Sequence, residues 1–332
     1  MSFSEKHRKS AKARNVMDLK RIGCLVLSLV TLISFLSACQ VPSPDAQIPD
    51  DKKGDTAVVI ESLGKQLTYD TAPERVVALG YDLAEELAML GLADKIVAVA
   101  PCMYLIDDVK PEYRDKIGGI PVLPDGFSPG VPTLETVLSQ SPDFVLGYSY
   151  SFSEKSCGKV DDYIGNNINF YATEGTYVQD ATIDTTYSDF MNLGKIFRVE
   201  EKATALVEDI KAKAASIAAK IVGKDPVPLF VLDGGSATRL YTIGGVGFQN
   251  SLIEMAGGKN IFSDVDKDFA DVSMEELVAR DPEAIVIIEY YSADLGKEKI
   301  AFLESTPELQ DVKAVKDKKF IVVSGYRFFP CG

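Results

Sequence analysis

The sequence contains one histidine, His7, and no tryptophan. His7 lies in an N-terminal segment that we expect to be removed, so the mature protein would have no histidine. A Ser-His-Asp triad, a Cys-His pair and any histidine-based zinc or manganese site are therefore excluded. Basic residues are fewer than acidic ones: the sequence has 35 Lys and Arg and 49 Asp and Glu. Such an acidic chain, without a basic stripe, repels the phosphates of nucleic acid.

Motifs for nucleotide binding and for covalent catalysis are missing as well. Gly-Gly pairs at 234–235, 244–245 and 257–258 lack the G-x-G-x-x-G and phosphate-loop spacings. The run GYSYS from Gly147 to Ser151 is not a G-x-S-x-G elbow. We therefore expect no enzymatic activity, no cofactor and no metal site. A cell-surface hydrolase is the alternative from a different class, and the missing histidine argues against it.

The N-terminal segment, residues 1–38, is typical of a secretory signal. Seven Lys and Arg in residues 1–21 precede an apolar run, 22–36, that is short for a membrane span. The ending Leu-Ser-Ala-Cys39 resembles a bacterial lipobox, so we expect Cys39 to be acylated and the protein to be anchored outside the cytoplasm. An uncleaved N-terminal anchor is the alternative. Residues 39–56 are rich in Pro and Asp and predict a flexible tether.

Removal of residues 1–38 changes both the charge and the cysteine content. That segment holds seven basic and two acidic residues, so 28 and 47 remain and the formal net charge becomes −19. Cys102, Cys157 and Cys331 remain besides Cys39, without C-x-x-C spacing. Outside the cytoplasm Cys102 and Cys157 could form a disulfide, but three free thiols fit the sequence equally well.

One stretch of sequence occurs twice. Residues 132–147 read PTLETVLSQSPDFVLG, and residues 272–287, 140 positions later, read VSMEELVARDPEAIVI. Each copy predicts a short helix capped by Thr133 or Ser273, a turn at proline and a buried strand. Glu276 would complete a capping box with Ser273. The duplication predicts an α/β fold of two similar lobes, each a mainly parallel sheet flanked by helices.

Between the lobes, apolar residues recur at helical spacing from about 187 to 222. We expect one long linking helix there, with an N-terminal lobe at 57–186 and a C-terminal lobe at 223–332. Two ordinary helices that meet near Gly194 are the alternative. The other elements that we expect are a hairpin over 57–69, strands at 75–79, 95–100, 169–172, 228–233 and 320–324, and helices from an N-cap at Asp82 to Gly91, over 248–256 and over 302–313.

Tyrosine and arginine follow many of the predicted strands. Ligands of open α/β sheets bind beyond the carboxyl ends of the strands, so these residues would line a cleft of phenol donors with guanidinium groups for anionic oxygens. The candidates are Tyr81, Tyr104, Tyr148, Tyr150, Arg239, Tyr241, Tyr290, Tyr291, Tyr326 and Arg327. The alternative is that these side chains pack locally or are merely solvated.

Glu135 and Glu275 occupy matching places in the two repeat copies. Each falls in the first turn of its helix, where a carboxylate stabilises the helix dipole by about 0.3–1 kcal/mol. Their symmetric placement also suits a two-fold partner that offers a basic residue to each lobe.

The runs PERVVALGYDLAEELAMLGLADKIVAV and NSLIEMAGGKNIF, together with the two repeat copies, resemble the periplasmic-binding-protein family of iron-siderophore, haem and cobalamin ABC importers. The lipobox resembles the lipoprotein form of that family. The resemblance implies two lobes bridged by one long helix, a shallow ligand cleft, and docking of Glu135 and Glu275 onto arginines of a dimeric permease. The ligand that we expect first is a ferric siderophore, with haem and cobalamin as alternatives. Family members usually end with a helix after the last strand, so we expect a truncated C-terminal lobe or one that closes differently.

Overall fold

The computed structural model describes residues 57–327 except 103, 127, 291 and 293, and describes Arg327 by its backbone alone. The predicted signal, the acylated Cys39 and the tether therefore lie outside the described residues, as do Tyr291, the side chain of Arg327, and Cys331. In the part of the chain that is described, no helix has the length and hydropathy that crossing a bilayer requires.

The N-terminal lobe is built on a parallel sheet of four strands in the order β4-β3-β5-β6. The chain enters it through an antiparallel hairpin, β1 (Val58–Ser62) and β2 (Lys65–Tyr69). Side chains of the sheet strands are almost all buried, as the apolar sequences predict. The sheet strands are β3 (Val76–Ala78), β4 (Ile96–Val99), β5 (Phe144–Gly147) and β6 (Asn169–Ala172), and the helices are α1 (Tyr81–Met89), α2 (Pro111–Gly118), α3 (Leu134–Leu138) and α4 (Val160–Gly165).

The C-terminal lobe repeats this plan with its own sheet, in the order β12-β11-β7-β9. In chain order the two sheets have the same arrangement, in which the first strand lies between the second and the third. A small antiparallel pair, β8 (Tyr241–Ile243) with β10 (Phe269–Asp271), is added beside it. The sheet strands are β7 (Val227–Leu232), β9 (Gly258–Asn260), β11 (Ala284–Glu289) and β12 (Phe320–Ser324), and the helices are α7 (Phe248–Met255), α8 (Met274–Arg280), α9 (Asp294–Ser305) and α10 (Lys313–Lys316).

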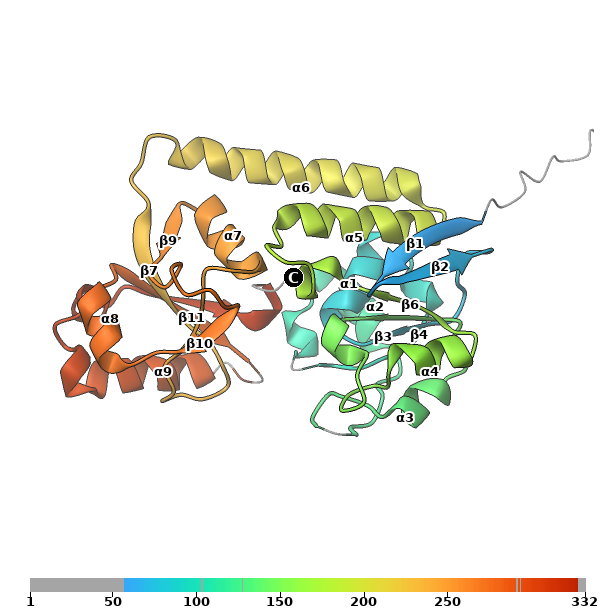
Figure 1. Cartoon of the computed structure of the whole chain (residues 1–332), viewed down its shortest axis with the longest axis horizontal. Helices are drawn as coiled ribbons and strands as arrows, with labels where there is room; N and C mark the ends of the chain where they lie inside the picture. The colour runs from blue at the N-terminus through green and yellow to red at the C-terminus, as the bar shows by residue number, and fades with distance from the viewer. Residues whose placement is uncertain (1–56, 103, 127, 291, 293, 328–332) are drawn as a thin grey trace, which may run out of the picture. The chain divides into compact units, whose positions relative to one another are not determined.

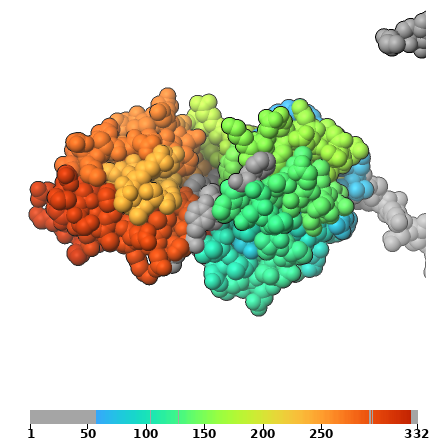
Figure 2. Space-filling view, turned by 90° about the horizontal axis from the view of Figure 1, so that it is seen from below, coloured from blue at the N-terminus to red at the C-terminus, as the bar shows by residue number. Residues whose placement is uncertain are grey.

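The two lobes are separate along the chain (Figure 1). On the face drawn in Figure 2 the colours of early and late residues do not intermix, so each lobe's surface there comes from one stretch of sequence. The apolar cores are separate too, except that Tyr326, from the end of the chain, belongs to the N-terminal core. The prediction of two similar α/β lobes is confirmed.

The duplicated stretch forms the capped helix and buried strand that its sequence predicts. In α3 the Thr133 hydroxyl accepts from the backbone N–H of Thr136 at 3.3 Å. In α8 Ser273 and Glu276 form the capping box, at 3.1 and 2.9 Å. The strands that follow, β5 and β11, each pair with the first strand of their own sheet.

The linking segment is two helices, so the prediction of one continuous helix over 187–222 is wrong. α5 (Ile183–Ile196) ends at a turn, and α6 (Glu200–Ile221) packs back along it (Figure 1). At the turn Arg198 has a φ of 59°, and its guanidinium donates to the carbonyl groups of Lys195 and Ile196 at 2.8 and 2.9 Å. The 22-residue helix α6 packs on α5 and contacts α7, so it bridges the two lobes, and α5 itself also contacts α7.

Two local predictions also fail, and one of two alternatives that the sequence left open is excluded. Asp82 is not the N-cap of α1, because that place is held by Gly80, and Asp82 is buried in the first turn of the helix. The helix predicted over 302–313 begins earlier, at Asp294, and ends at Ser305, because Pro307 starts a 3-10 turn. Cys102 and Cys157 are buried free thiols, so the disulfide alternative is wrong.

Gly194 allows the close approach of α5 to α6. A Cβ built on Gly194 would lie 2.5 Å from the Cβ of Ala203 on α6, closer than two carbons can pack. We expect Gly194→Ala to lower the free energy of unfolding by about 1–3 kcal/mol, as overpacking does. Gly165→Ala, at the end of α4 where an added Cβ would meet no atom of another segment within 4 Å, is the control and should change the free energy of unfolding little. Urea denaturation of both variants tests this, and equal stability would contradict it.

Candidate functional site

A cavity of about 890 Å³ lies where strand ends and loops of the two lobes meet. The N-terminal lobe contributes Tyr104 and the segments 148–150 and 175–180. The C-terminal lobe contributes Tyr241, Tyr290 and the segments 233–235, 246–249 and 266–269. The cavity lies in the region where tyrosines after the strands predicted a ligand cleft.

The structure brings half of the predicted ligand residues together. Tyr104, Tyr148, Tyr150, Tyr241 and Tyr290 line the cavity. Tyr81, Arg239 and Tyr326 are not among the lining residues. The sequence argument missed the loops 175–180 and 266–269, which do not follow directly on a strand of either main sheet. Their signal in the sequence was their composition, since both combine aromatic and carboxylate side chains.

Two phenol–carboxylate pairs lie at the carboxyl ends of the sheets, one in each lobe. In the N-terminal lobe Tyr148, which follows β5, donates its hydroxyl proton to Asp82, which lies just beyond β3. In the C-terminal lobe Tyr290, which follows β11, donates to Asp233, which follows β7, at 2.6 Å. The same pairing of third strand with first strand occurs in both lobes, so the site shares the pseudo-symmetry of the sequence repeat.

Burial alters the acidity of both carboxyl groups. Burial raises the pKa of Asp82 from its usual 3.8 to about 7, although the hydrogen bond from Tyr148 acts in the opposite direction. The pKa of Asp233 is likewise raised by burial and lowered in part by Tyr290. Nearby in the N-terminal lobe, burial also raises the pKa values of Glu86 and Asp189, and the charges of Asp189 and Asp82 raise the pKa of Glu86 further.

A buried cation lies beneath the C-terminal side of the cavity. Lys299, on α9, is 0% exposed and donates to the carbonyl groups of Ile288 and Leu232 at 2.7 and 3.3 Å. Burial lowers its pKa to about 8, while Asp233 and Glu289 favour the protonated form. Ile288 is the last residue but one of β11, and Leu232 is the last residue of β7. Lys299 therefore connects the strand ends after which Tyr290 and Asp233 follow.

Two pairs of stacked aromatic rings give the cavity flat apolar faces. The rings of Tyr148 and Tyr150 lie 4.9 Å apart with planes inclined by 16°. Those of Tyr241 and Phe269 lie 5.7 Å apart at 8°. All four residues line the cavity, so a large ligand could pack against both faces.

Arg239 is held outside the lining by a carboxylate of its own lobe. Its guanidinium makes two hydrogen bonds to Asp271, at 2.5 and 2.7 Å, and lies 4.5 Å from the centre of the Tyr241 ring. Both partners of this ion pair are more than half exposed. Arg239 therefore supports the outer face of Tyr241.

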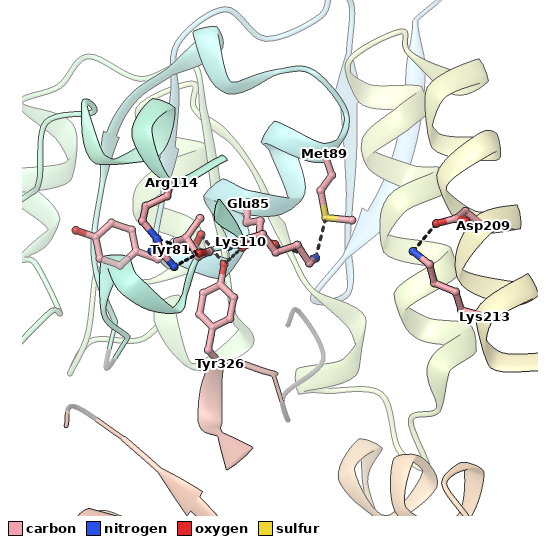
Figure 3. A network of polar contacts seen from close by, with 9 residues as sticks. Tyr81, Glu85, Met89, Lys110, Arg114, Asp209, Lys213 and Tyr326 are labelled. Carbon is pink, nitrogen blue, oxygen red and sulfur yellow. Dashed lines mark hydrogen bonds and ion pairs between the residues drawn. The ribbon is translucent and has the colours of Figure 1, made fainter. Parts of the chain in front are cut away.

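Tyr326 joins the end of the C-terminal lobe to the N-terminal lobe (Figure 3). Its side chain is 2% exposed and its hydroxyl donates to Glu85 on α1, which also pairs with Lys110 at 2.8 Å. Its ring meets the ring of Tyr104 edge-on, with centroids 5.3 Å apart. Beside it, Ser324 at the end of β12 donates to Asp108 at 2.9 Å. Tyr326 thus supports a lining residue from behind and fastens the last strand to the opposite lobe.

The structure also places the predicted docking glutamates and the side chains that could act as metal ligands. Glu135 and Glu275 are both exposed, in the first turns of α3 and α8. Within the described residues, no group of three or more His, Cys, Asp or Glu side chains is arranged to hold a metal ion.

The raised pKa of Asp82 predicts a pH-dependent stability. The buried carboxyl binds its proton more tightly in the folded protein than in the unfolded chain, so its contribution is lost as the pH rises from about 4 to 7. In Asp82→Asn this loss should shrink by on the order of 3 kcal/mol, while the amide still accepts from Tyr148. Urea denaturation at several pH values measures it, with the exposed Asp115→Asn as the control. Parallel curves for wild type and Asp82→Asn would contradict the expectation.

A family model and two related proteins all point to binding proteins. Residues 76–326 match the family model described as periplasmic binding protein. An uncharacterized ABC transporter substrate-binding lipoprotein of Bacillus subtilis is 25% identical over 271 residues, which cover 80% of each chain. A vitamin B12-binding protein of Yersinia pestis is 25% identical over 217 residues, 65% of this chain and 70% of the other.

A solved structure agrees with the fold. The crystal structure of an ABC-type Fe3+-hydroxamate transport system protein from Saccharomonospora viridis is 21% identical, covers 82% of this chain and 94% of that chain, and superposes with a TM-score of 0.67. The region that matches the family model, residues 76–326, includes both four-stranded sheets, α6 and every lining residue of the cavity. The chain therefore belongs to the periplasmic binding protein family and is a substrate-binding protein of an ABC transporter.

Proposed function

We propose that the protein captures a ferric siderophore outside the cytoplasm and delivers it to the permease dimer of an ABC importer, held at the membrane by a lipid on Cys39. The cavity between the two lobes is the observation that carries this proposal. Its volume of about 890 Å³ falls in the range of small-molecule sites, about 300–1,000 Å³, and at the large end, where a metal chelate fits. The stacked aromatic faces and the phenol groups offer both apolar contact and hydrogen bonds to such a chelate.

The lipid anchor and the transport role rest on separate support. The sequence Leu-Ser-Ala-Cys39 resembles a lipobox, and the relative from Bacillus subtilis is named a lipoprotein. The structural neighbour from Saccharomonospora viridis is named for Fe3+-hydroxamate transport. The interlobe contacts of Tyr326 and the α6 bridge favour a limited closure around the ligand.

Cobalamin is the second candidate ligand, because a relative of 25% identity is named a vitamin B12-binding protein. Its corrin ring would use the same flat aromatic faces. Haem is the third member of the same class. The hydrolase alternative receives no support from a family whose role is transport.

Titration of the purified protein against ferric siderophores, cobalamin and haem tests the ligand class. Because tryptophan is absent, quenching of tyrosine fluorescence would report binding. Tyr150→Ala removes an exposed ring of one stacked pair and should weaken binding of the true ligand by roughly threefold to tenfold. Tyr113→Ala, on α2 outside the lining, is the control. Binding of cobalamin or haem alone would replace the siderophore proposal.

The docking role proposed for Glu135 and Glu275 has its own test. Loss of charge-assisted contacts to permease arginines typically costs about 2–5 kcal/mol for a buried pair, so Glu135→Gln/Glu275→Gln should bind ligand normally but fail to support import. Glu112→Gln/Glu201→Gln removes two exposed first-turn glutamates from other helices, so it controls for the helix-dipole effect. Uptake of radioactive iron in cells with equal protein levels is the measurement. Normal uptake by the first double variant would leave the dipole role as the only one.

A further inference from the structure

The cavity lining carries an excess of negative charge. Four carboxylates line it: Asp233 on its inner wall and Asp180, Asp266 and Asp268 on exposed loops at its rim. Lys267 is the one cationic side chain among the described lining residues. The sequence predicted guanidinium groups that would bind anionic oxygens, but no arginine is among the described lining residues.

The rim carboxylates belong to two loops, one from each lobe. Asp180 follows the loop that begins beyond β6, whereas Asp266 and Asp268 precede β10. All three are exposed, so water screens each one and no single close pair is expected. Their effect is a negative field at the entrance, which favours the approach of a cation and slows the approach of an anion.

The phenol groups of the inner wall act in the same direction. Tyr148 and Tyr290 each donate their hydroxyl proton to a buried carboxyl group. A phenol whose proton is committed in this way can only accept a hydrogen bond from a ligand, and its ring face attracts a cation. Positively charged donors such as ammonium groups satisfy both features. Negatively charged oxygens satisfy neither.

We propose that the cavity selects cationic metal chelates, and specifically ferric hydroxamates that carry a protonated amine. This inference rests on the proposed function. Hydroxamate groups carry one negative charge each, so three of them neutralise iron(III), and a protonated amine then makes the complex a cation. Three catecholate groups instead leave a trianion, which the rim repels. The carboxylates of haem meet the same repulsion.

A matched pair of ligands separates charge from shape. The probes are a ferric linear trihydroxamate with a free terminal amine and the same chelate with that amine acetylated. The first should bind about tenfold more tightly at low salt, and the ratio should fall as salt screens the rim. A ferric tricatecholate should not bind measurably at the same concentrations. Isothermal titration calorimetry gives all three affinities.

A triple variant tests whether the rim causes the selectivity. In Asp180→Asn/Asp266→Asn/Asp268→Asn the preference for the free amine should fall to about twofold or less, mainly through a slower association of the cation. Glu308→Gln/Asp311→Asn/Asp115→Asn removes the same charge from exposed positions outside the lining and should keep the preference. Thermal denaturation of both triple variants checks that folding is intact.

The outcomes distinguish this inference from the proposed function. Tight binding of both hydroxamate chelates with equal affinity, or tighter binding of the tricatecholate, overturns the charge selectivity and leaves a siderophore-binding protein. Binding of none of the three iron chelates overturns the proposed function itself. Equal loss of preference in the two triple variants would place the selectivity in the net charge of the whole protein and overturn the role of the rim.

Discussion

The hydrogen bond from a tyrosine at the end of one strand to an aspartic acid at the end of its neighbour is the interaction on which the site depends. Burial of a carboxyl group is costly unless it is hydrogen-bonded, so Asp82 and Asp233 each need the phenol that faces them. The bond orients Tyr148 and Tyr290 at the cavity wall, because a side chain fixed at its hydroxyl has little freedom left. Both lobes contain the same type of hydrogen-bonded pair.

The pairs depend in turn on the parallel sheets. In each lobe the first and third strands are hydrogen-bonded neighbours, which brings their carboxyl ends to one edge. Lys299 strengthens this arrangement on the C-terminal side by donating to the ends of β7 and β11. In the N-terminal lobe burial raises the pKa values of Asp82 and Glu86 and so favours their neutral forms.

The lobes are held to each other by helix packing, in which α5 and α6 both contact α7, and by residues at the end of the last sheet. α6 packs on α5 in one lobe and contacts α7 in the other. Tyr326 and Ser324 return from the last sheet to Glu85 and Asp108. Tyr326 also supports Tyr104, so the connection reaches the lining itself. We expect a cavity braced in this way to rearrange little around its ligand.

The sequence by itself determined the architecture and the edge at which the site lies. The repeat over 132–147 and 272–287 encodes one supersecondary unit twice, with local signals of capping, proline and apolar strands, so both lobes could be predicted. Tyrosines that follow strands identified five lining residues for the same reason, since parallel strands end at a common edge. The helix break at Arg198 was weakly encoded, because the apolar spacing continues through it and only packing against Ala203 requires Gly194.

Only the tertiary structure decided which strand-end side chains face the cavity. Tyr326 turns into the N-terminal core because Glu85, 241 positions earlier in the chain, accepts its hydroxyl proton there. Arg239, which precedes β8, turns to Asp271, which the β8–β10 pairing places opposite Tyr241. The rim carboxylates come from loops whose place depends on the assembly of both lobes. Side-chain direction at a strand end follows partners that are distant in sequence, and local patterns carry no information about them.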